Sequence, residues 1–246
     1  MAYKFTLSTD STCDLYHDFI VENDIKFVSL TFMIEKEGSI SDHLDNFTNY
    51  QQYVDFYNEL RAGALSRTSM LNYESHYDHF LKLAKEGAED VVHFTISSGL
   101  SPTKTVAAKA AAEVKKEYPK FEVYVVDPLT ATVGQGTLVR IALQDRNAGK
   151  TAKETYDHVN SLREHIQHFI VADDLNYLKR GGSVRRVTCS CLPAGLQEGS
   201  PPPEATHIKL SPGCFFVMLS DGVADSLDDE WLQNLLAGWE GHDPQQ

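Results

Sequence analysis

Three clusters of hydroxyl side chains in this sequence could bind an anion. They are residues 8–12 (STDST), the pair Thr68 and Ser69, and residues 97–101 (SSGLS). Serine and threonine hydroxyls, together with the free backbone N–H groups at a helix start, can bind a carboxylate or a phosphate without any formal positive charge. The same residues also occur at helix starts as ordinary N-caps, so one cluster alone indicates little. Three clusters at one edge of a sheet would predict an anion site.

The elements that must position these clusters alternate between strand and helix patterns over the first 187 residues. Strand patterns occur at residues 5–9, 25–32, 90–96, 121–126 and 169–172, and helical spacing occurs at residues 53–61, 73–86, 103–118, 134–146 and 153–165. This alternation predicts an α/β fold with a mainly parallel sheet and helices on both faces. Ligands of such sheets bind at the carboxyl ends of the strands. We therefore expect the three clusters to lie at that edge.

The composition excludes several classes of function. The chain has 246 residues, with 35 acidic and 22 basic side chains, so its net charge of −13 opposes binding to nucleic acid. No apolar run is long enough for a membrane-spanning helix, and the N-terminus has no signal-peptide pattern. Four cysteines in a chain of this length do not indicate a disulfide scaffold. A cytoplasmic protein with reduced thiols is the expectation.

Other chemistry-bearing residues have ordinary interpretations, so we expect neither a metal nor a cofactor. His76 and His79 have the spacing of zinc ligands, but no further ligand follows at a suitable interval, and we interpret them as surface or helix-cap residues. The run at 134–136 (GQG) lacks the third glycine of a dinucleotide-binding motif and indicates a tight turn or a helix start. Asp10 and Asp14 are expected to cap a turn.

The order of these motifs resembles the DegV family of bacterial fatty-acid-binding proteins. The matching segments are residues 8–15 (STDSTCDL), 67–69 (RTS), 95–101 (TISSGLS), 126–127 with 134–136 (VD, GQG) and 174–182 (DLNYLKRGG). The resemblance implies a two-domain protein that holds a long-chain fatty acid, with the carboxylate near hydroxyl groups and the tail in an apolar tunnel. It also implies that the protein is no enzyme, but presents the acid to a separate fatty acid kinase.

The resemblance also implies the residues that bind the carboxylate. Thr68 and Ser69 would bind the head group, as would Ser97 with Ser98 beside it. The Gly-Gly-Arg motif of the family reads GGS at 181–183, so its arginine is missing. Arg180, or one of the arginines at 185 and 186, would have to replace it.

The last quarter of the chain has a different composition, which predicts a domain boundary near residue 187. Residues 188–246 contain nine acidic residues and one basic residue. The run at 216–225 (FVMLSDGVAD) resembles the final third of sporulation-type metal-dependent serine phosphatases, in which Asp221 would match one metal ligand. The other ligands of that family are absent, so no working metal centre is expected.

These observations predict three segments and leave three functions open. The segments are a DegV-like N-terminal α/β domain (1–168), the start of a truncated second domain (169–187) and a short β-rich and helical phosphatase-like fragment (188–246). Fatty-acid binding for a kinase is the favoured function. The alternatives are an incomplete metal-dependent serine phosphatase and a non-functional chimera.

Overall fold

The computed structural model describes residues 3–166. Contacts divide the chain into two compact units, Met1–His168 and Phe169–Gln246, and all described residues belong to the first. Several predictions lie outside the described residues: the strand at 169–172, Arg180, the truncated second domain, and the phosphatase-like fragment with Asp221.

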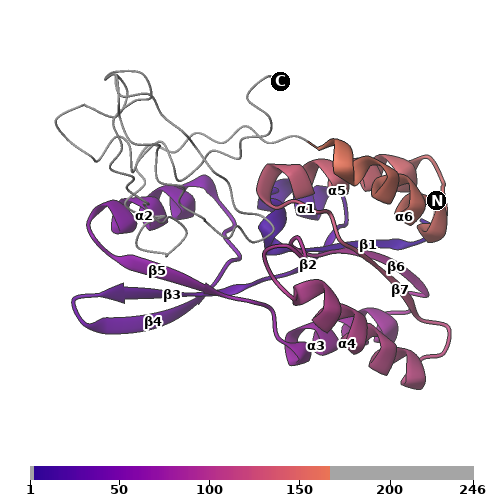
Figure 1. Cartoon of the computed structure of the whole chain (residues 1–246), viewed down its shortest axis with the longest axis horizontal. Helices are drawn as coiled ribbons and strands as arrows, with labels where there is room; N and C mark the ends of the chain where they lie inside the picture. Colours follow the sequence, from indigo (N-terminus) through magenta and orange to yellow (C-terminus); the bar gives the residue numbers. More distant parts are fainter. Residues whose placement is uncertain (1–2, 167–246) are drawn as a thin grey trace, which may run out of the picture. The chain divides into compact units, whose positions relative to one another are not determined.

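A four-stranded parallel sheet forms the centre of the first unit (Figure 1). Its strand order is β2-β1-β6-β7, and each neighbouring pair is parallel. The strands are β1 (Thr6–Asp10), β2 (Lys26–Val28), β6 (Asp90–Phe94) and β7 (Glu122–Val126). Since all four strands run in the same direction, their carboxyl ends meet at one edge. The predicted α/β fold with a mainly parallel sheet is therefore confirmed for the described residues.

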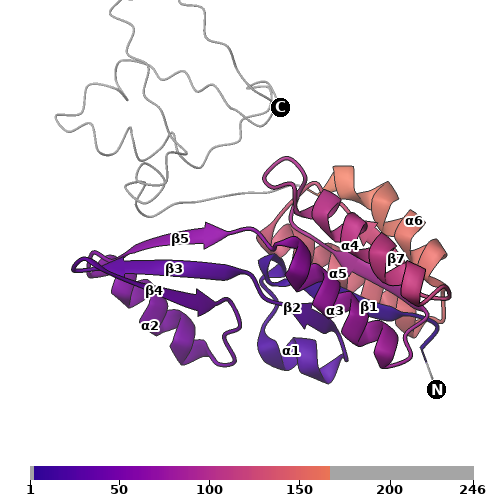
Figure 2. The same ribbon diagram turned by 90° about the horizontal axis from the view of Figure 1, so that it is seen from below.

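A second, antiparallel sheet lies beside the parallel one (Figure 2). Its strand order is β4-β3-β5, with β3 (Thr31–Lys36), β4 (Ser39–Leu44) and β5 (Leu65–Ser69). Helix α2 (Tyr50–Arg61) accompanies this sheet, and a small core joins them, made of Phe32, Ile34, Ala64, Phe47, Phe56 and Leu60. We refer to this sheet and α2 as the small lobe.

The small lobe corrects the sequence prediction in one respect. The run at 25–32 was expected to form one strand, but the structure divides it between β2 in the parallel sheet and the start of β3 in the small lobe. β4 and β5 were not predicted. Every residue of β4 is exposed and most of β5 is polar, so neither strand carries the apolar alternation that marks a half-buried strand. Glu37 and Gly38, both with positive φ, form the turn between β3 and β4.

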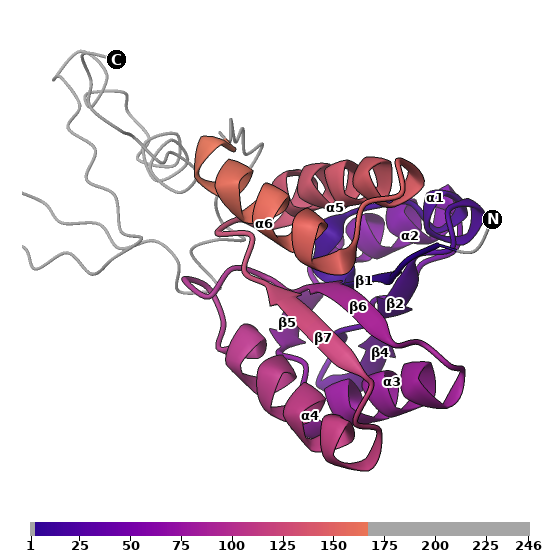
Figure 3. The same ribbon diagram turned by 90° about the vertical axis from the view of Figure 1, so that its right-hand side faces the viewer.

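Helices cover both faces of the parallel sheet (Figure 3). On one face lie α3 (Tyr73–Lys85) and α4 (Thr103–Glu117), and on the other lie α1 (His17–Glu22), α5 (Thr132–Asn147) and α6 (Ala152–Leu162). Two short 3₁₀ helices, η1 (Ser11–Cys13) and η2 (Arg163–His165), complete the described part. Local signals set the helix starts: Asn72 caps α3 by accepting the N–H of Ser75, and Thr151 forms a capping box with Glu154 at α6.

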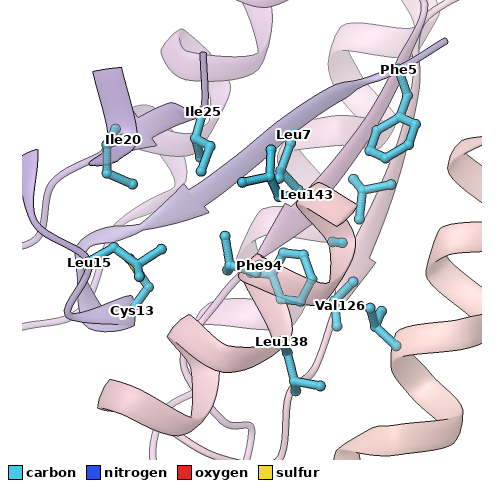
Figure 4. Packing of buried hydrophobic residues seen from close by; sticks show 14 of the residues in the cluster. Phe5, Leu7, Cys13, Leu15, Ile20, Ile25, Phe94, Val126, Leu138 and Leu143 are labelled. Atoms are coloured by element: carbon cyan, nitrogen blue, oxygen red, sulfur yellow. The ribbon is translucent and has the colours of Figure 1, made fainter. Parts of the chain in front are cut away.

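Alternate residues of the strands enter two separate cores. Leu7, Val92 and Val126 belong to the cluster that includes residues of α5 and α6, and Figure 4 shows Leu7 and Val126 within it from close by. Val91 and Val125 point the opposite way, into the cluster beneath α3 and α4. This alternation follows from the two-residue period of a strand whose two faces are both buried. Rigid packing on both faces fixes the strand ends that carry the hydroxyl clusters.

Candidate functional site

The loop after β6 forms a tight turn around Ser97, and we call residues 96–101 the serine turn. Ser97 is 6% exposed. Its carbonyl oxygen accepts the N–H groups of Leu100 (3.0 Å) and Ser101 (3.1 Å), and its hydroxyl oxygen accepts the N–H of Gly99 (3.2 Å). A hydroxyl that accepts one hydrogen bond can still donate its own hydrogen to an anion. Hydrogen bonds thus hold the backbone and side chain of Ser97, and its O–H group can still donate to a ligand.

Ser98, the neighbouring residue, is exposed and is tied to the end of β7. Its N–H donates to Oδ1 of Asp127 at 3.1 Å, and Leu129 N–H donates to the same oxygen at 3.2 Å. Burial alone would raise the pKa of Asp127. Hydrogen bonds from the side chain and backbone of Ser98 and from Leu129, together with the charge of Lys104, hold this pKa below its usual value instead. Asp127 is therefore an ionised anchor for the serine turn.

Thr68 and Ser69 lie at the carboxyl end of β5, in the small lobe, and both are exposed. In the antiparallel register Thr68 is opposite Phe32, and Ser69 is opposite Thr31. The helix predicted to follow them is present, because α3 begins a few residues later, at Tyr73. The strand that these two residues end was not predicted.

Hydrogen bonds connect the small lobe to the carboxyl edge of the parallel sheet. The backbone N–H of Leu30, which precedes β3, donates to the hydroxyl of Ser11 at 3.0 Å. Ser11 directly follows β1. Because Thr31 pairs with Ser69, this bond brings the strand pair that ends β5 into contact with the loop after β1. The residue that precedes the strand partner of Ser69 is therefore tied to Ser11 of the first hydroxyl cluster.

Asp10 links the first and third clusters directly. Its Oδ2 accepts the backbone N–H of Ile96 at 2.9 Å, and its Oδ1 accepts the N–H of Thr12 at 3.1 Å. As expected from the sequence, Asp10 caps the turn after β1 as the N-cap of η1, and Asp14 occupies the C-cap position. Burial raises the pKa of Asp10, while the hydrogen bonds from Thr12, Gln135 and Ile96 oppose that shift.

Gln135 is a member of this site that the sequence did not identify. It is fully buried in α5, and its Nε2 donates to Oδ1 of Asp10 at 2.8 Å and to Oγ1 of Thr9 at 3.3 Å. It lies in the GQG run at 134–136, which was predicted to form a turn or a helix start. That prediction is confirmed, because α5 begins at Thr132.

The interpretation of His76 and His79 as surface or cap residues is wrong. His76 is fully buried and His79 is partly buried, both against the fully buried His93 of β6. The ring centroid of His93 lies 5.5 Å from that of His76 and 5.7 Å from that of His79. The hydroxyl oxygen of Ser8 lies 2.8 Å from Nε2 of His79 and 2.9 Å from Nδ1 of His93. The signal was available: His76 stands four residues before Phe80, on the apolar stripe of α3.

Burial keeps these three histidines neutral. It lowers the pKa of His76 and of His79 to about 4 and lowers that of His93 well below its usual value; the neighbouring histidines add to the shift for His79 and His93. Both ring nitrogens of His76 and Nε2 of His93 have no hydrogen-bond partner in the structure. Residues 3–166 contain no group of three or more histidine, cysteine or acidic side chains arranged to hold a metal ion. We treat the trio as part of the core.

An open groove of about 490 Å³ adjoins the serine turn. Its lining includes Ser98 and Asp127, together with Lys104 and Lys109 of α4. Within the described part of the chain, no helix is both long and apolar enough to span a bilayer.

Comparisons with known proteins identify relatives of this arrangement. The sequence model of the DegV family of uncharacterised proteins matches residues 4–190. A DegV domain-containing protein of Clostridium perfringens is 32% identical over 181 residues, which are 74% of this chain and 60% of that protein. The family match ends before the run at 216–225, and these comparisons do not support the predicted phosphatase-like fragment.

Solved structures show the same fold. A DegV family protein from Thermus thermophilus, described as binding fatty acid, is 29% identical with a TM-score of 0.57, over 73% of this chain and 60% of its own. A stearic acid-binding protein from Eubacterium ventriosum has a TM-score of 0.63 at 23% identity, over 76% of this chain and 62% of its own. The chain spans about three fifths of the length of the curated relatives it matches.

Proposed function

Because this chain belongs to the DegV family, we propose that it binds a long-chain fatty acid whose carboxylate is held by hydroxyl groups at the carboxyl edge of the parallel sheet. The observation that carries the proposal is the serine turn, which holds the buried Ser97 with its hydroxyl able to donate. The relative from Thermus thermophilus that is described as binding fatty acid shares this fold.

The proposed head-group residues are Thr68 and Ser69 of the small lobe, and Ser97 and Ser98 of the serine turn. A carboxylate that leaves water needs hydrogen bonds to replace its hydration, and hydroxyl and amide donors provide them. Hydroxyl and amide donors can do so while leaving one carboxylate oxygen available for phosphoryl transfer. Arg180, which lies outside the described residues, remains part of the proposal as a further partner of the head group.

The hydrocarbon tail would supply most of the binding free energy. At ~0.8 kcal/mol for each buried methylene, the roughly fourteen methylenes of a sixteen-carbon acid contribute about 11 kcal/mol before the costs of association are subtracted. The hydrogen bonds between the hydroxyl groups and the carboxylate would then add little binding free energy and would mainly orient the head group.

The protein would act as a carrier and not as an enzyme. We propose that it presents the bound acid to a separate, cytoplasmic fatty acid kinase, which phosphorylates the carboxylate to an acyl phosphate. No cofactor is needed for this role. The incomplete phosphatase is not proposed, because no described residue supports it.

Native mass spectrometry of the gently purified full chain tests the proposal. A bound acid of long chain length is expected, and its mass would give the chain length. The double variant Thr68→Ala with Ser97→Ala should retain much less lipid than the wild type. A matched control, Thr137→Ala with Ser161→Ala, removes two exposed hydroxyls from α5 and α6 and should retain the wild-type amount. An empty wild-type chain that also fails to take up added palmitate would refute the proposal.

A further inference from the structure

We propose that Asp10 is the positioning residue of the head-group site: its carboxylate holds the serine turn in the shape in which Ser97 can bind the fatty acid. This inference rests on the proposed function. It assigns a role in ligand binding to a residue that sequence patterns describe as a turn cap and that does not itself reach the ligand.

The geometry around Asp10 is that of a buried hub. The side chain is fully buried, and four donors converge on it. Oδ1 accepts the backbone N–H of Thr12 (3.1 Å), the hydroxyl of Thr12 (2.6 Å) and Nε2 of Gln135 (2.8 Å). Oδ2 accepts the N–H of Ile96 (2.9 Å). Both oxygens of an aspartate side chain can accept hydrogen bonds, whereas an asparagine of the same size would turn a donor toward one side of the hub.

The hub joins three elements that are distant in sequence. Asp10 ends β1, Gln135 lies 125 residues further on in α5, and Ile96 opens the serine turn 86 residues after Asp10. The Ile96 N–H belongs to the residue directly before Ser97. The Ser97 N–H itself donates to the carbonyl of Thr130 at 3.0 Å, so Ser97 is held toward the loop after β7 by its own backbone and toward the end of β1 by the Asp10 carboxylate.

Asp10 acts through the turn and not by contact with the ligand. It is closed off from solvent, and a second carboxylate beside it would be repelled. Its hydrogen bond to Ile96 instead fixes the backbone while Ser97 keeps its own hydrogen for the lipid. Asp127 supports the other side of the same turn through the N–H of Ser98. Two carboxylates, of Asp10 and Asp127, thus hold the turn through the N–H groups of Ile96 and Ser98.

Asp10→Asn is the informative variant, because it keeps the size of the side chain and replaces one acceptor oxygen by an NH₂ donor. Whichever way the amide turns, a donor faces either Ile96 or the pair Thr12 and Gln135. In one orientation the serine turn loses the hydrogen bond from the Ile96 N–H. In the other orientation the side chain at position 10 loses its hydrogen bonds from Thr12 and Gln135. We expect the variant to bind palmitate at least tenfold more weakly than the wild type.

Asp145→Asn is the matched control for loss of a buried carboxylate. Asp145 is 5% exposed and pairs with Lys150 (2.7 Å) and His158 (2.6 Å), where α5 leads into α6. This variant should lower the melting temperature at least as much as Asp10→Asn, yet keep palmitate affinity within twofold of the wild type. Both variants are made in the full chain, delipidated, and titrated with palmitate by calorimetry.

Amide hydrogen exchange distinguishes a local change in the serine turn from a general loss of stability, because it gives the exchange rate of each N–H group separately. The N–H groups of Leu100 and Ser101, which donate to the Ser97 carbonyl, should exchange faster in Asp10→Asn than in Asp145→Asn. Should Asp10→Asn fail to fold, Thr12→Val removes one hydroxyl from the hub at constant volume, and should weaken palmitate binding two- to fivefold with faster exchange at the same amides.

The outcomes separate this inference from the proposed function. If the wild-type chain binds no fatty acid, the proposed function fails and the inference fails with it. If the wild type binds and Asp10→Asn binds equally well, the inference alone is overturned. It is also overturned if affinity falls in both aspartate variants in proportion to their melting temperatures, since Asp10 would then be only structural.

Discussion

Gly136 of α5 lies so close to the loop after β1 that a Cβ atom on it would stand 2.4 Å from the carbonyl oxygen of Cys13. The same atom would stand 3.3 Å from the side chain of Leu15. Helix and loop therefore touch through backbone, and only glycine permits this approach. The contact keeps Gln135, the preceding residue, directly against Asp10. The need for glycine at position 136 is therefore explained by this packing and not by a bound nucleotide.

The first prediction concerns this contact. Gly136→Ala should destabilise the fold by about 1–3 kcal/mol, the usual cost of forcing an extra methyl group into a packed interface. Urea unfolding followed by circular dichroism measures the effect. Thr137→Ala, at the next and exposed position of the same helix, is the control and should change stability by less than about 0.5 kcal/mol. Equal stability of the two variants would show that α5 can move away from the loop without cost.

The second prediction concerns the buried histidines. Because burial lowers the pKa of His76 and of His79 to about 4, the folded state binds fewer protons than the unfolded state, whose histidines titrate near 6.5. Stability should be complete above about pH 7 and fall as the pH decreases from 6.5 toward 4. Each histidine contributes up to about 1.4 kcal/mol for each pH unit in that window.

Urea midpoints at several pH values between 7 and 4.5 would measure this loss. His76→Phe, which removes one titrating ring beneath α3, should flatten the pH dependence, although its stability at pH 7 depends on how well the larger ring packs. His43→Gln, at an exposed position on β4, is the control and should leave the slope unchanged. An identical slope in His76→Phe and wild type would mean that His76 is protonated without cost.

The third prediction concerns two carboxylates that repel each other. Burial, and then the charge of Asp45, raise the pKa of Asp14 to about 6. Asp14 also has a φ of 50°, which asparagine tolerates well. Asp14→Asn should therefore stabilise the protein at pH 7 by about 0.5–1 kcal/mol. This is less than the whole pKa shift implies, because the burial of Asp14 is only partial and water still reaches and screens its side chain.

The pH dependence of that gain checks its cause. A raised folded-state pKa means that ionisation of Asp14 costs stability above pH 6, and that the cost vanishes as the pH falls below the unfolded value of 3.8. The gain from Asp14→Asn should thus shrink between pH 7 and pH 4. Asp18→Asn, in the first turn of α1, should instead be neutral or slightly destabilising. A gain that stays constant with pH would point to backbone conformation alone.

The sequence predicted the parallel sheet and its helices because both carry strong periodicity. Helical spacing at 73–86 and 103–118 matches α3 and α4 to within one residue. β4 and β5 were missed since they bury almost nothing, and pairing with β3 is what makes them strands. The residue pattern within β4 or β5 therefore could not predict these strands, because they depend on pairing with β3.

The candidate site divides in the same way. The serine turn could be placed after a strand because its hydroxyls follow an apolar run. The partnership of Asp10 with Gln135 could not, because residues so distant in sequence are brought together only by the folded chain. His76 was misjudged for a related reason: its polar type outweighed its position on the apolar stripe beside Phe80. The contacts that Gln135 and His76 make are tertiary contacts, so the sequence pattern alone could not predict them.

The small lobe has its own core, distinct from the two that enclose the parallel sheet. Thr68 therefore lies in a part of the first unit that has its own core, and Ser97 lies beside the parallel sheet. A lipid head group bound by both hydroxyls would act as a non-covalent cross-link between them. The loaded protein should melt as one cooperative unit, whereas the empty protein should lose the small lobe first.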